Sequence, residues 1–261
     1  MNRLKIPLFW LIAVALILSA CVSTSTNPRD NVSLKQASQD NVALGVGYLQ
    51  QGRRDVAMQK LQLAIQQDPN NANAYSALGL LYNGSGDLDR ADENYRKALQ
   101  KAPDDPQIQN NYAVFLCQQG KPKQSEKYFI EAAQNPLYPT PEAAYANAGV
   151  CADRIPDEAA AEQYFRKSLA INPNYPLSLY QMARISYENK QYRDALVYIQ
   201  RFDSASPTPR PEVLLLGVKI DGALGDTQGA AGYAKKLRIL FPNSVETQQL
   251  NQSYNNAGNG G

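Results

Sequence analysis

The small and apolar residues of the chain recur with a period of 34 residues. The positions that repeat in two consecutive blocks are Leu44, Gly45, Tyr48, Gly52, Ala57, Leu61, Ala64 and Pro69, followed by Leu78, Gly79, Tyr82, Gly86, Ala91, Tyr95, Ala98 and Pro103. The apolar positions on either side of the block's central glycine lie three or four residues apart, as on one face of an α-helix. Each block therefore predicts two helices joined by a turn.

The two helices of each block are expected to lie antiparallel and close together. Gly45 and Ala57 are small enough to let them approach, while Leu44, Tyr48 and Leu61 are expected to fill the space between them. The proline at the end of the block closes the second helix. A period of 34 residues with this pattern is typical of the tetratricopeptide repeat (TPR).

Weaker copies of the pattern continue along the chain and predict six units. Their expected bounds are 38–71, 72–105, 106–141, 142–175, 176–209 and 210–243. Residues 244–261 are expected to form a short capping helix and a frayed tail, because the open end of a repeat stack needs a polar cover. The predicted fold is an all-α, right-handed superhelical solenoid of about six TPR units, whose first helices line a concave groove.

The N-terminus carries the features of a bacterial lipoprotein signal peptide in residues 1–20. Arg3 and Lys5 precede an apolar run that is too short for a membrane span and that ends in Leu-Ser-Ala before Cys21. We expect Cys21 to be lipidated and to become the new N-terminus, with residues 21–37 forming the lipidated end and a flexible tether. The alternative is an ordinary secretory signal, in which Cys21 is incidental.

Lipidation of Cys21 would anchor the mature protein stably, because several acyl chains exceed what stable membrane attachment requires. Residue 22 is Val rather than Asp. By resemblance to sorted lipoproteins, this favours the inner leaflet of the outer membrane, with the folded chain facing the periplasm.

Composition and charge narrow the possible functions. The 26 basic and 24 acidic residues give a net charge of +2, which is too small an excess of basic charge to indicate binding to the phosphate backbone of nucleic acid. The chain contains no histidine, which removes the commonest general base and metal ligand. We therefore expect no enzymatic activity, no metal, no cofactor and no small-molecule substrate.

Two pairs of neighbouring carboxylates are candidates for acid/base chemistry or metal binding. Asp87 and Asp89, and Asp104 and Asp105, each stand at a predicted turn before a helix. Aspartate at that place caps the helix and favours its positive end. Capping is therefore the expected role of both pairs.

Cys117 and Cys151 are the two cysteines that remain in a periplasmic chain. An even pair in an oxidising compartment suggests a disulfide, and the repeat register places both residues on the first helices of adjacent units. Two buried free thiols are the alternative. A catalytic thiol is disfavoured because no histidine is present to activate it.

The repeat register also predicts which residues face the concave groove. They are Val42, Val46, Leu49, Leu80, Val114 and Val150 in the N-terminal half, and Tyr180, Arg184 and Tyr187 in the C-terminal half. The first group would suit a hydrophobic segment of a partner protein, and the second could supply aromatic and guanidinium anchors. In the alternative interpretation, the valines only pack between neighbouring units.

Several of these features together resemble the PilF/PilW family of type IV pilus biogenesis lipoproteins. They are the lipoprotein motif, the six units, the segments Asn111–Cys117 and Asn147–Cys151, and the Pro136–Tyr138 insertion. The resemblance implies a pilotin role, in which the protein binds the secretin subunit and promotes its localisation and multimerisation at the outer membrane. It also implies a Cys117–Cys151 disulfide. A general TPR adaptor lipoprotein, scaffolding cell-wall or outer-membrane assembly enzymes, is the competing hypothesis.

Overall fold

The computed structural model describes residues 28–155 and 157–258. The regular elements in these residues are α-helices. Their bounds are α1 Pro28–Gln50, α2 Arg54–Gln67, α3 Ala72–Gly84, α4 Leu88–Lys101, α5 Pro106–Gln118, α6 Pro122–Gln134, α7 Pro141–Arg154, α8 Glu158–Ile171, α9 Pro176–Glu188, α10 Tyr192–Ala205, α11 Pro211–Leu224, α12 Thr227–Leu240 and α13 Val245–Gly258. The signal peptide and Cys21 lie outside the described residues.

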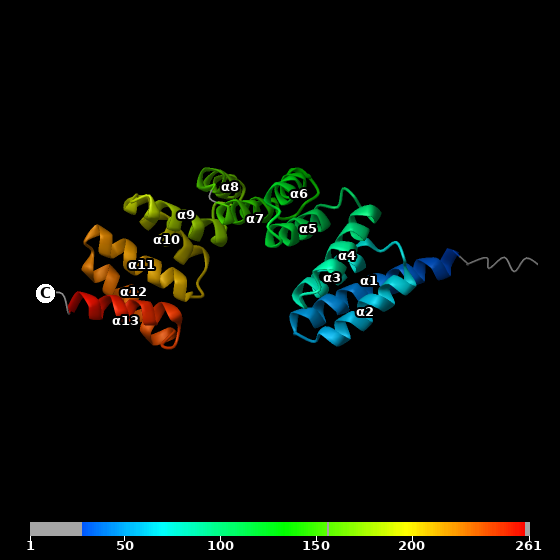
Figure 1. Ribbon diagram of the computed structural model, residues 1–261, viewed down its shortest axis with the longest axis horizontal. Helices are drawn as coiled ribbons and strands as arrows, with labels where there is room; N and C mark the ends of the chain where they lie inside the picture. The colour runs from blue at the N-terminus through cyan, green and yellow to red at the C-terminus, as the bar shows by residue number, and fades with distance from the viewer. Residues whose placement is uncertain (1–27, 156, 259–261) are drawn as a thin grey trace, which may run out of the picture.

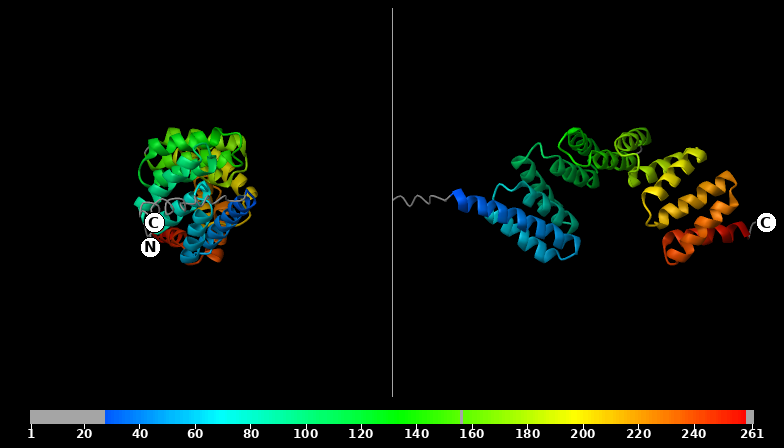
Figure 2. Two further views of the ribbon diagram at one scale, coloured as in Figure 1. Left: turned by 90° about the vertical axis from the view of Figure 1, so that its right-hand side faces the viewer. Right: turned by 180° about the vertical axis from the view of Figure 1, so that it is seen from behind.

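The helices pack as consecutive pairs, from α1 with α2 to α11 with α12, and α13 packs on the last pair. Figure 1 shows the pairs following one another along an arch, with α1–α4 in one foot and α9–α13 in the other. At the crest, α6 and α8 lie on the outer side and α5 and α7 on the inner side. The view from behind in Figure 2 shows the same arch. The predicted all-α TPR solenoid is confirmed.

Each pair is held by a small residue of the first helix that faces a large residue of the second. A Cβ atom added to Gly79 would lie 2.9 Å from the ring of Tyr95, and one added to Gly149 would lie 2.6 Å from Phe165. The same relation, 16 residues along the chain, recurs for Gly45 with Leu61 and for Gly217 with Tyr233. The helix backbones thus approach as closely as the large side chains permit, and the sixth, degenerate unit packs like the others.

One aspartate of each predicted pair caps the helix that follows, and Asp89 lies in the first turn of α4. Asp87 is the N-cap of α4 and its carboxylate accepts a hydrogen bond from the Arg90 amide at 3.1 Å. Asp105 is the N-cap of α5 and accepts from the amides of Gln107 and Ile108. The hydrogen bonds from Arg90 hold the pKa of Asp87 below its usual value. These carboxylates are occupied in forming the fold.

Two expectations about the first unit are wrong. The tether was expected to reach residue 37, but α1 begins at Pro28, since proline suits the first turn of a helix and no glycine interrupts the following residues. Leu44 was expected to fill the space between α1 and α2, but it is 49% exposed. Its register position faces the place of a preceding unit, and the described chain has none there.

The C-terminal end of the stack is covered by α13, where a capping helix was expected. Leu250 of α13 is buried in one cluster with Leu214, Leu215 and Leu237 of α11 and α12. The hydroxyl of Thr247 donates a hydrogen bond to the Phe241 carbonyl at 2.7 Å. The last apolar face of the solenoid is thereby closed.

We expect Gly149→Ala to lower the free energy of unfolding by about 1–3 kcal/mol, because the new methyl group would overlap the Phe165 ring. Gly232→Ala in the middle of α12 is the matched control, since its Cβ would meet nothing within 4 Å. That variant should gain about 0.5–1 kcal/mol from helix propensity. Urea unfolding followed by circular dichroism measures both, and equal stability of the two variants would contradict the packing described.

Candidate partner-binding surfaces

The predicted groove residues of the N-terminal half differ in how accessible they are. Leu80 of α3 is 49% exposed. Val42, Val46 and Leu49 of α1 are half-buried and pack against the core cluster formed with α2 and α3. Packing therefore takes up much of the surface of these three residues, and Leu80 is the most accessible of the predicted groove residues in this half.

The groove residues farther along the chain are also half-buried. Val114 and Val150 pack against the core cluster around the two cysteines. Tyr180 and Tyr187 pack against the cluster formed by α9, α10 and α11. The predicted set thus lies on the first helices, but its members contribute to packing between units as well as to the surface.

A ladder of polar contacts joins the first helices of neighbouring units. Asn83 of α3 donates a hydrogen bond to Gln118 of α5 at 2.8 Å, and Asn147 of α7 donates to Asn110 of α5 at 3.1 Å. These amides retain further donors and acceptors. The first helices therefore offer fixed polar groups beside the apolar ones, which suits an extended peptide better than a purely apolar groove would.

Arg184 continues this ladder between α7 and α9. Its guanidinium forms ion pairs with Asp153 of α7 and Glu188 of α9, both at 2.7 Å. Burial lowers the pKa of Arg184, the two carboxylates raise it, and the net shift is upward. Because two carboxylates already neutralise Arg184, it acts as a link between units rather than as a free anchor for an anionic partner.

A surface that the sequence interpretation missed lies on the face of α1 that corresponds to the α2-facing side of α3. It is a hollow of 560 Å³ lined by Asp40, Ala43, Leu44, Gly47, Tyr48 and Gln51. The equivalent positions of α3, at Ala74, Ala77, Leu78 and Leu81, are at most 7% exposed, because α2 covers them. The repeat register contained a signal for this surface, since α1 belongs to the first repeat unit and no described helix precedes it.

Its shape and chemistry favour a helical occupant. In the next unit the same face receives α2, whose Leu61 joins Ala77, Leu78 and Leu81 in one cluster. A partner helix with an apolar face could occupy the corresponding place on α1, where Leu44 is open. We call this surface, lined by Asp40, Ala43, Leu44, Gly47, Tyr48 and Gln51, the α1 face.

Cys117 of α5 and Cys151 of α7 form a disulfide in the structure, with their Cα atoms 5.7 Å apart. Both residues are buried, and the hydroxyl of Ser125 lies 3.1 Å from the Cys151 sulfur. The bond joins the first helices of the third and fourth units. It therefore fixes the spacing of the inner face at the crest of the arch.

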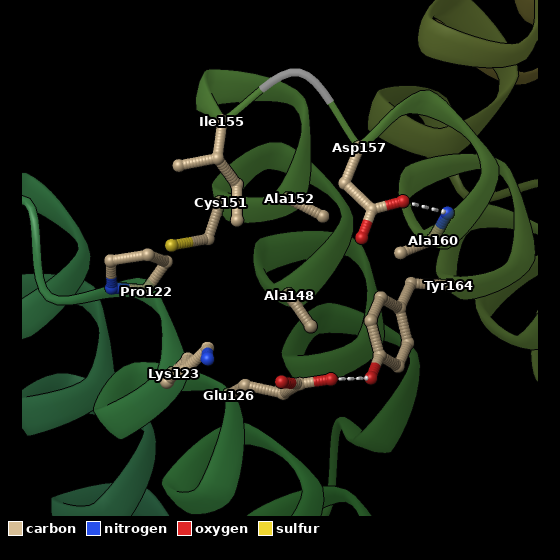
Figure 3. A pocket seen from close by; sticks show the side chains of 10 residues that line it. All are labelled: Pro122, Lys123, Glu126, Ala148, Cys151, Ala152, Ile155, Asp157, Ala160 and Tyr164. Carbon is tan, nitrogen blue, oxygen red and sulfur yellow. Dashed lines mark hydrogen bonds between the residues drawn. The ribbon is translucent and has the colours of Figure 1, made fainter.

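A small cavity beside Cys151 lies between α6, α7 and α8 (Figure 3). The hydroxyl of Tyr164 donates a hydrogen bond to the Glu126 carboxylate across it, and burial together with this contact raises the pKa of Tyr164. The cavity holds about 50 Å³, whereas ligand pockets in proteins measure roughly 300–1,000 Å³. It can accommodate a water molecule, and it is too small for a substrate.

The described residues contain neither a membrane-spanning helix nor a cluster of metal ligands. Among the helices of residues 28–155 and 157–258, none has the length and hydropathy that a membrane span requires. In the same residues, no three cysteine or acidic side chains gather closely enough to hold a metal ion.

Comparison with known proteins identifies the repeats. Residues 47–86 match the TPR repeat family, and residues 82–136, 116–176 and 164–197 match tetratricopeptide-repeat families. The type IV pilus assembly protein PilF of Pseudomonas aeruginosa is 32% identical over 248 residues, which cover 94% of this chain and 97% of that protein. The chain belongs to the PilF/PilW family of type IV pilus biogenesis factors.

Solved structures of two PilF/PilW family members agree with this. The crystal structure of PilW, described as a widely conserved type IV pilus biogenesis factor, is 34% identical, with a TM-score of 0.73 over 82% of this chain and 98% of PilW. A structure of Pseudomonas aeruginosa PilF is 32% identical, with a TM-score of 0.75 over 85% of this chain and 99% of PilF. The resemblance inferred from the sequence is confirmed.

We expect replacement of both Cys117 and Cys151 by alanine to lower the free energy of unfolding of this PilF/PilW family chain by about 4 kcal/mol. A cross-link that closes a loop of about 35 residues lowers the conformational entropy of the unfolded chain, and this destabilises the unfolded state by about that amount. Urea unfolding of the native chain with and without reductant provides the comparison. An unfolding midpoint that neither reduction nor the double variant changes would mean that the bond does not support the fold.

Proposed function

We propose that the protein acts as a pilotin, a lipid-anchored factor that binds the secretin subunit and promotes its localisation and multimerisation at the outer membrane. Membership of the PilF/PilW family supports a role in type IV pilus biogenesis. The lipoprotein motif ending at Cys21 supports the anchor. The repeat architecture supports a binding function, because solenoids use extended surfaces to bind other proteins.

The observation that carries the proposal is the open α1 face. Leu44 and Leu80 are each 49% exposed, on two first helices at the N-terminal end of the stack. An apolar segment of a secretin subunit could cover Leu44 as a helix or pack along Leu80, and removing such groups from water favours association. In either position, the apolar segment would be withdrawn from water.

The anchor and this surface are close together in the chain. Six residues separate Cys21 from Pro28, where α1 begins, and six residues span at most about 20 Å. A subunit bound to α1 would therefore stay near the membrane, where its effective concentration is raised. The lipid would hold the protein at the membrane. The apolar surface would cover the bound segment and prevent aggregation until neighbouring secretin subunits take over that contact.

Charge placed on the exposed leucines tests the proposal. Leu44→Glu and Leu80→Glu, separately and together, should weaken binding of the purified secretin subunit at least tenfold, because a carboxylate buried in an apolar contact is costly. Both side chains are largely solvated, so the helical circular dichroism signal should not change. Surface plasmon resonance measures the binding.

The matched control is Ile239→Glu on α12, at the other end of the solenoid, where the isoleucine is 64% exposed. It should bind the secretin subunit like the native chain. If only one of the two leucine variants loses affinity, it identifies which helix receives the partner. Native affinity in the double variant would overturn the assignment of this surface.

A further inference from the structure

A second groove, away from the α1 face, lies between α4 and α6, with α5 as its floor. Two adjoining hollows of 640 and 620 Å³ share Leu99, Lys127 and Tyr128 as lining residues. Together they follow α6 from Lys123, at its start, to Pro136, just beyond its end. A helix of 13 residues is about 20 Å long, so the groove matches about six residues of extended chain.

The middle of this groove is apolar and aromatic. Leu99 and Tyr128 are half-buried, and the Tyr128 ring meets the edge of Tyr112 at a centroid distance of 5.2 Å. The Tyr112 hydroxyl donates a hydrogen bond to Asp92 at 2.9 Å. Burial and the neighbouring carboxylate raise the pKa of Tyr112 to about 12, so its phenol stays neutral even in mildly alkaline solution. An apolar side chain of a ligand would pack against these groups.

One end of the groove is basic. Its lining includes Arg96, Lys123 and Lys127, and it includes no acidic side chain. Arg96 is paired with Asp92 at 2.6 Å, and Lys127 reaches Glu131 only at 3.8 Å. Within the part of the chain that the structure describes, no ion pair involves Lys123. Lys123, and Lys127 through its long contact with Glu131, therefore lie on one face of α6 where a carboxylate could pair with both.

The other end of the groove provides hydrogen-bonding groups. Gln109 lines it and is 6% exposed, and its amide donates a hydrogen bond to the Pro103 carbonyl at 2.9 Å. Its carbonyl oxygen is buried without a hydrogen-bond partner among the described residues. A buried acceptor without a donor is unfavourable, and such groups are rare in folded proteins. The side chains of Gln134 and Asn135 line the same end, together with the carboxylates of Asp104 and Glu131. Carboxylates of a ligand are therefore expected at the Lys123 end of the groove and not at this one.

We propose that this groove binds an extended segment of a partner protein that alternates carboxylate and apolar side chains. Carboxylates would pair with Lys123 and Lys127, and an apolar side chain would cover Leu99 and Tyr128. The backbone of the segment would exchange hydrogen bonds with the amide groups at the far end. The site is separate from the α1 face and does not depend on the secretin proposal.

The test uses an eight-residue fluorescent peptide of alternating aspartate and leucine, and the mature chain kept free of lipid by Cys21→Ser. Fluorescence anisotropy should detect saturable binding that Lys123→Glu with Lys127→Glu weakens at least tenfold. A peptide of alternating lysine and leucine, and one of alternating aspartate and serine, should bind at least tenfold more weakly than the first. The charge-matched control, Lys219→Glu with Lys235→Glu on α11 and α12, should leave the affinity unchanged.

Three results would overturn the proposal. They are no saturable binding of the aspartate and leucine peptide, equal binding of the lysine and leucine peptide, and native affinity in the Lys123 and Lys127 variant with its circular dichroism unchanged. The groove could instead bind a second copy of this chain, and sedimentation velocity tests this by measuring the oligomeric state. A dimer that the Lys123 and Lys127 variant abolishes would assign the groove to self-association instead of to a peptide.

Discussion

The close approach of two helices at one small residue per unit is the constraint on which this fold depends. Gly79 and Gly149 lie directly against the rings of Tyr95 and Phe165, so that no side chain can be added without displacing the ring. In the third unit the corresponding residues are Ala113 and Phe129, and both are buried. Because this contact recurs in every unit, each helix pair has nearly the same shape and the pairs can stack. The arch and both of its surfaces follow from that stacking.

Stacking also explains why the two ends of the solenoid differ. Each internal first helix turns one face toward the preceding second helix, as α3 does toward α2. At the C-terminal end, α13 closes the stack with Leu250. At the N-terminal end, α1 keeps its corresponding face open, with Leu44 half in solvent. Among the described residues, the end of the stack that follows Cys21 in the chain is therefore the one with an uncovered apolar face.

Much of this architecture follows from the sequence, because it depends on contacts within one unit. The register of Gly79 with Tyr95, and the caps at Asp87 and Asp105, are local features that recur with the period of 34 residues. The register also placed Cys117 and Cys151 on adjacent first helices, where the structure joins them. Helices, turns and unit count are accordingly predictable from spacing alone.

Exposure could not be predicted in the same way, because it depends on what a neighbouring unit covers. Val46 and Leu80 share one register position, yet Val46 packs against the core and Leu80 is 49% exposed. Leu44 has the pattern of a core residue and is half exposed, because no described helix covers that face of α1. The groove beside Lys123 lies between α4 and α6, the second helices of two consecutive units, and α5 forms its floor. No pattern within one repeat encodes such a gap.

The pilotin role is decided by the state of the secretin in cells that lack this protein. Outer-membrane fractions of a deletion strain are assayed for heat-resistant secretin multimers, with rescue by the native chain and by Cys21→Ser. We predict that multimers are lost on deletion and restored by the native chain, and that the Cys21→Ser variant fails to restore them at the outer membrane. Multimers that persist unchanged in the deletion strain would contradict the role and favour a general adaptor lipoprotein.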